Sequence, residues 1–168
     1  MASAAGSTAD GSINRSRRTL PRAWPLLFPL TYLLHVLEEY YCGERFFYWA
    51  TRLSGIQLTA KTFLQINKFG LIVVFLLALL VVMIPALRWL MIPLATVVLI
   101  NGSAHTLGSI LSFSYSPGLV TGLLLWVPLG LVTLRRTRPT VSAAQFWALT
   151  IVGLLLHGLV VMAVVMNR

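Results

Sequence analysis

The chain has 168 residues, of which 58% are hydrophobic and only 10% are charged, and its mean hydropathy is +0.85. This composition excludes an ordinary soluble domain, because apolar stretches of about 20 residues, long enough for a helix to cross a bilayer, recur along the sequence. The formal charge of +9 does not indicate a nucleic-acid partner, since the basic residues lie at the ends of these stretches, where anionic membrane lipids are the favoured partner.

Residues 1–20 are small, polar and basic, and they are expected to form a disordered leader before a single transmembrane domain over residues 22–167. The basic and aromatic segment 42–68 is too mixed to span a bilayer and is predicted to be an amphipathic segment at the interface. Five membrane-spanning helices are predicted, at residues of about 22–41, 69–87, 89–113, 118–134 and 145–166. The expected fold is therefore an all-α, polytopic integral membrane bundle.

The distribution of basic residues predicts the orientation of this multi-pass protein. Cytoplasmic loops carry an excess of lysine and arginine. A cytoplasmic N-terminus places the larger share of these residues inside, namely Arg15, Arg17, Arg18, Arg22, Arg88, Arg135, Arg136 and Arg138. An odd number of spans then places the C-terminus outside.

The end of the first predicted span carries an unusual polar group, HVLEE at residues 35–39. Residues three and four apart share one face of a helix, so His35, Glu38 and Glu39 project to the same side. Ionisable groups within a bilayer are costly unless they pair, face a cavity or bind a metal, and no lysine or arginine lies within a predicted span. In the alternative interpretation the span ends before Glu38, and both carboxylates lie in the headgroup region.

The third and fifth predicted spans supply two further histidines at a similar depth. Asn101 and His105 repeat at an interval of four in the third span, and His157 lies in the fifth. Spans one, three and five run in the same direction, so a rise of 1.5 Å per residue places His35, His105 and His157 within about two helical turns of one level. The structural alternative for His105 is a hydrogen bond between helices.

The segment YSPG, residues 115–118, is predicted first of all to be the turn between the third and fourth spans, because proline fixes φ and glycine tolerates positive φ. Tyr115 is a candidate to cover the polar group or to donate a hydrogen bond to it. HVLEE, His105 and YSPG together resemble the family of membrane proteins named for its His-x-x-Glu-Glu motif, over residues of about 25–160. The resemblance implies that the family's characteristic positions here are His35, Glu38, Glu39, His105, Tyr115, Pro117 and Gly118. It supplies no reaction.

The leading hypothesis from the sequence is a membrane enzyme that acts on a lipid or isoprenoid-like hydrophobic substrate. Its catalytic candidates are Glu38, Glu39, Asn101, His105 and Tyr115. A divalent metal, either zinc, iron or manganese, would be held by candidate ligands that mix carboxylates and imidazoles, namely His35, Glu38, Glu39, His105 and His157.

Two alternative functions fit the same residues. The first is a metal-free acid–base isomerase or cyclase of sterol or terpene substrates, in which a carboxylic acid protonates the substrate. The second is a proton-coupled carrier or small channel, in which these groups form a relay. The five predicted spans show no obvious internal repeat of the kind found in many carriers, although a homodimer would restore symmetry.

Overall fold

The computed structural model describes residues 20–166, and every regular element within them is helical. Nearly all of the predicted leader, residues 1–20, lies outside this range. The longer helices are α1 (Leu27–Tyr41), α2 (Phe46–Ser54), α3 (Ala60–Met83), α4 (Met91–Ser112), α6 (Val127–Thr137) and α7 (Ala143–Met166). The shorter elements are η1 (Trp24–Leu26), η2 (Pro85–Leu90), α5 (Leu119–Thr121), η3 (Gly122–Trp126) and η4 (Arg138–Thr140). The predicted all-α fold is confirmed.

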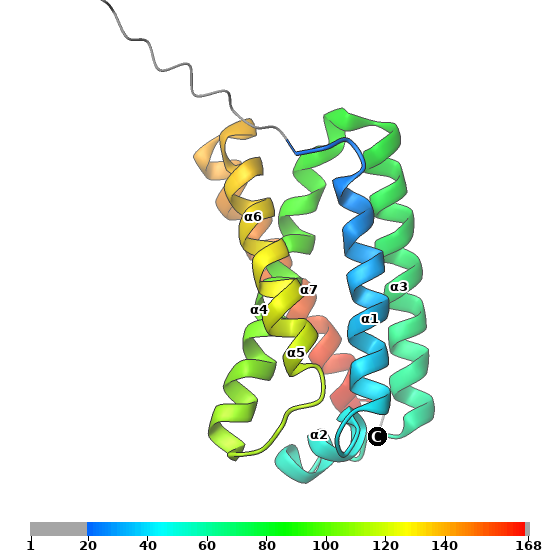
Figure 1. Ribbon diagram of the computed structural model, residues 1–168. Helices are drawn as coiled ribbons and strands as arrows, with labels where there is room; N and C mark the ends of the chain where they lie inside the picture. Colours follow the sequence, from blue (N-terminus) through cyan, green and yellow to red (C-terminus); the bar gives the residue numbers. More distant parts are fainter. Residues whose placement is uncertain (1–19, 167–168) are drawn as a thin grey trace, which may run out of the picture.

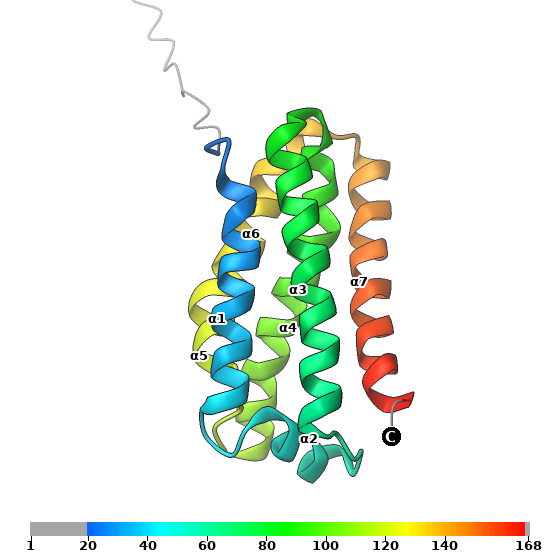
Figure 2. The same cartoon turned by 90° about the vertical axis from the view of Figure 1, so that its right-hand side faces the viewer.

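The long helices lie side by side in one bundle (Figures 1 and 2). α4 packs against α6, α7 and η3, whereas α1 packs against α3 and the short α5. α2 lies across the end of the bundle at which α1 finishes and α3 begins (Figure 2). The segment that joins α4 to α5 lies at the same end (Figure 1). This arrangement brings the C-terminal end of α1 close to residues that follow it by about 80 positions in the sequence.

Four helical stretches are long and apolar enough to cross a membrane, and they correspond to the predicted second to fifth spans: Ala60–Met83, Pro85–Ser112, Leu119–Thr140 and Ala143–Met166. The predicted polytopic bundle is thus confirmed. The first predicted span is not among these stretches. η1 and α1 run without a break over residues 24–41, and the polar side chains His35, Glu38 and Glu39 lower the hydropathy of this stretch. The orientation of the termini stays a prediction.

The predicted interfacial segment 42–68 is shorter in the structure, because α3 begins at Ala60 rather than near residue 69. The Thr59 hydroxyl accepts a hydrogen bond from the backbone N–H of Thr62, which caps the helix at this earlier position. A polar residue of the first turns, Asn67, accepts a hydrogen bond from the Tyr32 hydroxyl at 3.0 Å. Only α2 and its flanking loops therefore remain as the amphipathic segment.

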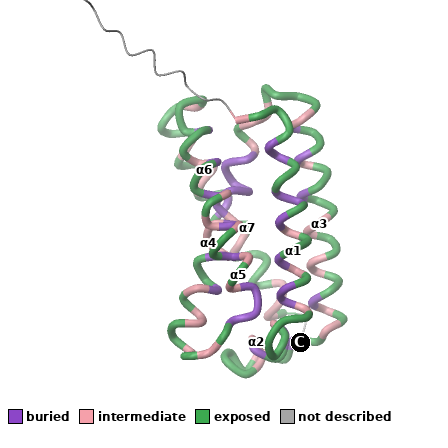
Figure 3. The backbone as a smooth tube through the Cα atoms, in the orientation of Figure 1, coloured by how far each residue is buried: buried purple, intermediate pink, exposed green. Residues whose placement is uncertain are grey.

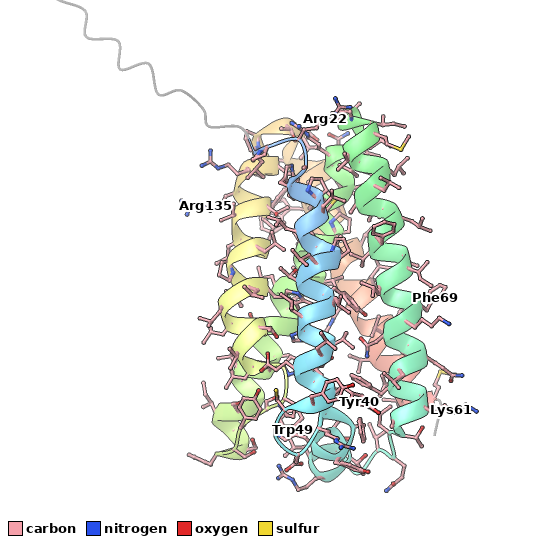
Figure 4. The ribbon with its side chains drawn as sticks, turned by 45° about the vertical axis from the view of Figure 1, so that its right-hand side comes forward. Arg22, Tyr40, Trp49, Lys61, Phe69 and Arg135 are labelled. Atoms are coloured by element: carbon pink, nitrogen blue, oxygen red, sulfur yellow. The ribbon has the colours of Figure 1, made fainter. Side chains whose placement is uncertain are left out.

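Burial in the bundle follows the inward faces of α1 and α4 (Figure 3). The main apolar core includes Phe28 of α1, Met91 and Val98 of α4, and Trp126 of η3. α7 has a single buried residue, Gly153, and its other side chains are exposed or half-buried. Phe69 on α3 points outward (Figure 4). In a membrane these outer apolar faces contact lipid, since the interior of a bilayer is as apolar as a leucine side chain.

Two glycines bring α4 and η3 into close contact. A Cβ atom on Gly102 would lie 2.6 Å from the carbonyl oxygen of Gly122. We expect Gly102→Ala to lower the free energy of unfolding by about 1–3 kcal/mol, a typical cost of overpacking. Gly158→Ala is the matched control, because nothing lies within 4 Å of a Cβ atom at this position on α7. Apparent unfolding temperatures in detergent measure both variants, and equal temperatures would contradict the prediction.

Candidate functional site

Three buried side chains from two helices converge near the C-terminal end of α1. His35 and Glu39 lie one turn apart on α1, and His105 comes from α4. Nε2 of His105 lies 3.3 Å from Oε1 of Glu39, and Nε2 of His35 lies 3.7 Å from the same oxygen. The three potential ligand atoms lie within 4.8 Å of one another. Each residue is at most 5% exposed, so bulk solvent does not screen this ligand group.

A hydroxyl group holds the second ring nitrogen of each imidazole. Nδ1 of His35 lies 2.8 Å from the Thr121 hydroxyl oxygen, and Nδ1 of His105 lies 3.0 Å from the Ser116 hydroxyl oxygen. Contacts of this kind fix the ring orientation of histidines that bind metals. Nε2 of His35 is buried and has no hydrogen-bond partner. Both Nε2 atoms are thus directed toward the Glu39 carboxylate, an arrangement that can hold a shared proton or a metal ion.

Glu38 lies beside the ligand group and caps another helix. Its Oε1 atom accepts hydrogen bonds from the Tyr115 hydroxyl and from the backbone N–H of Val120, the latter at 2.9 Å. Its Oε2 atom accepts from the hydroxyl and from the backbone N–H of Thr121, the latter at 2.7 Å. The N–H groups of a first helical turn have no partner within their own helix, and negative charge is favourable there. Glu38 therefore stabilises the start of the stretch Leu119–Thr140.

The first half of the YSPG segment makes hydrogen bonds to the polar residues of α1 and α4. Tyr115 donates to Glu38, while the Ser116 hydroxyl contacts the His105 ring. The backbone N–H of Ser116 also donates to the Ser109 hydroxyl at 2.8 Å. Burial and the hydrogen bond to Glu38 raise the pKa of the Tyr115 phenol, so this group stays protonated and remains a donor.

Gly118 closes the segment directly against the two imidazoles. Its φ angle is +96°, and a Cβ atom there would lie 2.8 Å from Cε1 of His35 and 2.9 Å from Cε1 of His105. Ser116, Pro117 and Gly118 are all buried, as Figure 3 shows for this connection. The segment is a turn, as predicted, and it is also one wall of the site.

Aromatic rings pack on both imidazoles. The Trp126 ring stacks on the His35 ring with 3.8 Å between their centroids. The Phe46 ring of α2 lies 5.4 Å from the His105 ring. The two imidazoles meet edge to face, with 4.9 Å between centroids. This contact confirms the predicted common depth for His35 and His105.

Comparison with known protein families agrees with these motifs. A family described as "Protein of unknown function with HXXEE motif" matches residues 26–133 of the chain. The chain belongs to the HXXEE family. No curated protein and no solved structure matches it. The matched residues include the ligand group, the YSPG segment and the cap formed by Glu38, so the resemblance of the sequence to this family is confirmed.

The two glutamates of the HXXEE motif have different surroundings. Glu39 faces the two imidazoles, whereas both oxygens of Glu38 are occupied by donors around the start of α5. The structure therefore assigns three of the five predicted metal ligands to one group, namely His35, Glu39 and His105. Glu38 lies next to this group and supports the wall that covers it.

Two other predicted site residues of this HXXEE protein lie beside the ligand group. Oδ1 of Asn101 is buried without a hydrogen-bond partner, and the side chain interacts with the His35 ring. His157 is half-buried on α7 and is close enough to His105 for an electrostatic interaction. His157 also lies beyond the residues that match the family. Neither residue supplies one of the three ligand atoms that converge, which come from His35, Glu39 and His105.

Sequence reasoning missed three residues that position the site in this HXXEE protein. Ser116 was within reach of such reasoning, because it lies inside the YSPG motif. Thr121 carries a hydroxyl in the first turn of a predicted apolar span, which is a weak signal for a polar contact. Trp126 gave no signal, since its stacking on His35 depends on the π-helical turn Gly122–Trp126.

Proposed function

We propose that the protein is an integral membrane enzyme that holds a divalent metal ion with His35, Glu39 and His105 and acts on a lipid or isoprenoid-like substrate. The observation that carries this proposal is the convergence of three buried ligand atoms within 4.8 Å of one another. Convergent ionisable groups inside a membrane protein are usually functional, because burying them is costly.

The negative charge of the buried Glu39 carboxylate favours a metal ion in the group, because the ion would compensate that charge. The ion-pair partners of Glu39 among the described residues are the imidazoles of His35 and His105. The other ring nitrogen of each imidazole contacts a hydroxyl, and a hydrogen bond at this nitrogen is usual for a histidine that binds a metal. Two imidazoles and one carboxylate suit zinc, iron or manganese, and three protein ligands leave coordination positions open, as catalytic sites do. Such an ion would supply a Lewis acid or an activated water.

A hydrophobic substrate fits the position of the site. α1 carries His35 and Glu39 on its inner face and exposes Leu30, Leu34 and Leu37 on its outer face. One helix thus separates the ligand group from lipid. The described residues contain no hydrophilic domain that would receive a soluble substrate. A substrate dissolved in the bilayer is therefore the chemistry that this architecture favours.

A metal-free acid–base enzyme is the second candidate, and the 3.3 Å contact between His105 and Glu39 favours it. A proton shared by this pair would be available for an isomerase or cyclase of a sterol or terpene substrate. The rings of Trp126 and Phe46 beside the imidazoles would stabilise a carbocation through their faces.

Metal content distinguishes the two candidates. The full chain, purified without a histidine tag from cells supplied with zinc, iron and manganese, is expected to contain one metal ion per protein by mass spectrometry. Glu39→Gln and His105→Gln are expected to lose it, because each removes one of three ligands. His157→Gln is the matched control and is expected to retain the metal, since His157 lies outside the group.

Two results would overturn the metal proposal. One is a folded protein that stays free of metal after supplementation with each ion. The other is metal that persists at full occupancy in both ligand variants. In the first case the metal-free enzyme gains support if solvent deuterium appears in a lipid product and the label disappears in Glu39→Gln.

A further inference from the structure

We infer that Glu38 and Thr121 set the tautomer of His35, so that the ring proton is on Nδ1 and the Nε2 lone pair faces Glu39. Thr121 is then a positioning residue for the ligand group, because it contacts the His35 ring but supplies none of the three ligand atoms. The inference deepens the proposed function and rests on it, since the tautomer of His35 matters for function only if Nε2 binds a cation.

The first step is that Glu38 acts only as an acceptor. The backbone N–H of Val120 donates to its Oε1 atom, and the backbone N–H of Thr121 donates to its Oε2 atom. A backbone N–H can only donate, so both oxygens accept, and an ionised carboxylate has no proton to donate in return. The hydroxyls of Tyr115 and Thr121 add one further contact to each oxygen. Four donors around one buried group match the acceptor capacity of a carboxylate.

The Thr121 hydroxyl donates to Glu38 and can therefore only accept from His35. A hydroxyl has one proton to donate. Because the Thr121 proton points to Oε2 of Glu38, the hydroxyl oxygen can only accept from Nδ1 of His35, which lies 2.8 Å away. The ring proton of His35 is therefore on Nδ1.

A proton on Nδ1 of His35 leaves a lone pair on the other ring nitrogen, Nε2. A neutral imidazole with its proton on Nδ1 has a lone pair on Nε2. In His35 this atom is buried without a hydrogen-bond partner and lies 3.7 Å from Oε1 of Glu39. The Asn101 side chain, whose Oδ1 atom is also buried without a partner, interacts with the same ring. Two acceptors, this lone pair and the Glu39 carboxylate, then face each other, and a cation between them would satisfy both. The chain Glu38–Thr121–His35 thus prepares Nε2 as a ligand atom before any ion binds.

The tautomer can be measured directly in metal-free protein. The chain contains three histidines, so the full chain labelled with ¹⁵N-histidine gives few ring signals in nanodiscs. Nitrogen chemical shifts distinguish a protonated from an unprotonated ring nitrogen, and His35→Gln and His157→Gln assign the signals. We expect His35 to have a protonated Nδ1 and an unprotonated Nε2. A proton on Nε2, alone or together with one on Nδ1, would overturn the inference.

Two variants of Thr121 test the cause of this tautomer. Thr121→Val removes the hydroxyl at nearly constant volume, so Nδ1 loses its acceptor and the proton is expected to move to Nε2, where Glu39 can accept it. Thr121→Ser retains the hydroxyl and is expected to keep the wild-type tautomer. Unchanged signals in Thr121→Val would assign the tautomer to another cause and overturn the role of Thr121. If the valine variant does not fold, the wild-type spectrum still decides the tautomer of His35, and Thr121→Ala repeats the test of its cause.

The experiment separates failure of this inference from failure of the proposed function. The spectra are recorded without metal, so a missing metal ion does not affect them. If the protein binds metal but His35 has its proton on Nε2 in the metal-free state, the metal proposal stands and the positioning role fails. If the tautomer is as expected but no metal binds, the metal proposal fails and the role of Thr121 in orienting His35 stands.

Discussion

Gly118→Ala is expected to lower the free energy of unfolding by about 2–6 kcal/mol and to abolish the proposed metal binding. One part of this cost is backbone strain, about 1–3 kcal/mol for a residue held in a sparsely populated region, since φ of Gly118 is +96°. The other part is overlap, about 1–3 kcal/mol, because the new methyl group would lie within 3 Å of both imidazoles. Relief of that overlap moves the rings of His35 and His105 away from Glu39.

A second glycine separates the strain from the overlap. Gly55 ends α2 with φ of +70°, and nothing lies within 4 Å of a Cβ atom there. Gly55→Ala is therefore expected to cost only about 1–2 kcal/mol, the cost of the left-handed backbone alone, and to retain the proposed metal. Apparent unfolding temperature in detergent and metal content measure both variants. If Gly118→Ala lost no more stability than Gly55→Ala, the close packing of the YSPG segment on the imidazoles would be refuted.

Glu38→Gln is expected to destabilise the protein by about 2–4 kcal/mol, because it leaves one buried backbone N–H without an acceptor and removes the negative charge of the carboxylate. The N–H of Val120 donates to one carboxylate oxygen of Glu38, and the N–H of Thr121 donates to the other. The amide of glutamine has only one oxygen, so it can accept from only one of them. Either orientation of the glutamine thus places its NH₂ group against a backbone N–H. The loss of negative charge at the first turn of α5 adds to the cost.

Glu44→Gln is the matched control for this substitution. Glu44 pairs with Arg52 at 3.0 Å, but both side chains are about half exposed, and exposed pairs contribute only about 0–1 kcal/mol.

Tyr115→Phe is expected to give an intermediate loss of about 1.5–3 kcal/mol, because it removes one hydrogen bond to a charged group. Thermal unfolding in detergent should rank the variants in this order. Equal effects of Glu38→Gln and Glu44→Gln would show that Glu38 does not cap α5.

Hydropathy and helical spacing were sufficient to predict much of this molecule. The lengths of the apolar stretches gave the second to fifth spans, and the interval of four residues placed His35 and Glu39 on one face. Counting the rise per residue along parallel spans brought His105 to the level of His35. These features depend on local geometry that repeats in every helix.

The different roles of the two glutamates could not be predicted from their spacing. Glu38 and Glu39 are adjacent, and their roles depend on where the start of α5 lies relative to α1, which is a tertiary contact. The early start of α3 at Ala60 was missed because Lys61 and Lys68 lower the local hydropathy, although the Thr59 cap is a recognisable signal. The stacking of Trp126 on His35 likewise depends on the local winding of η3.

The contacts of Glu38 also bear on how the chain enters the membrane during synthesis. The ribosome makes α1 well before the groups that stabilise its carboxylate, since Tyr115, Val120 and Thr121 follow Glu38 by 77, 82 and 83 residues. Until those residues emerge, Glu38 needs water or headgroups as partners. α1 has only 15 residues and carries the carboxylates in its last turn. We therefore expect both acids to stay at the membrane surface until α4 and the stretch Leu119–Thr140, which carry their partners, have been made.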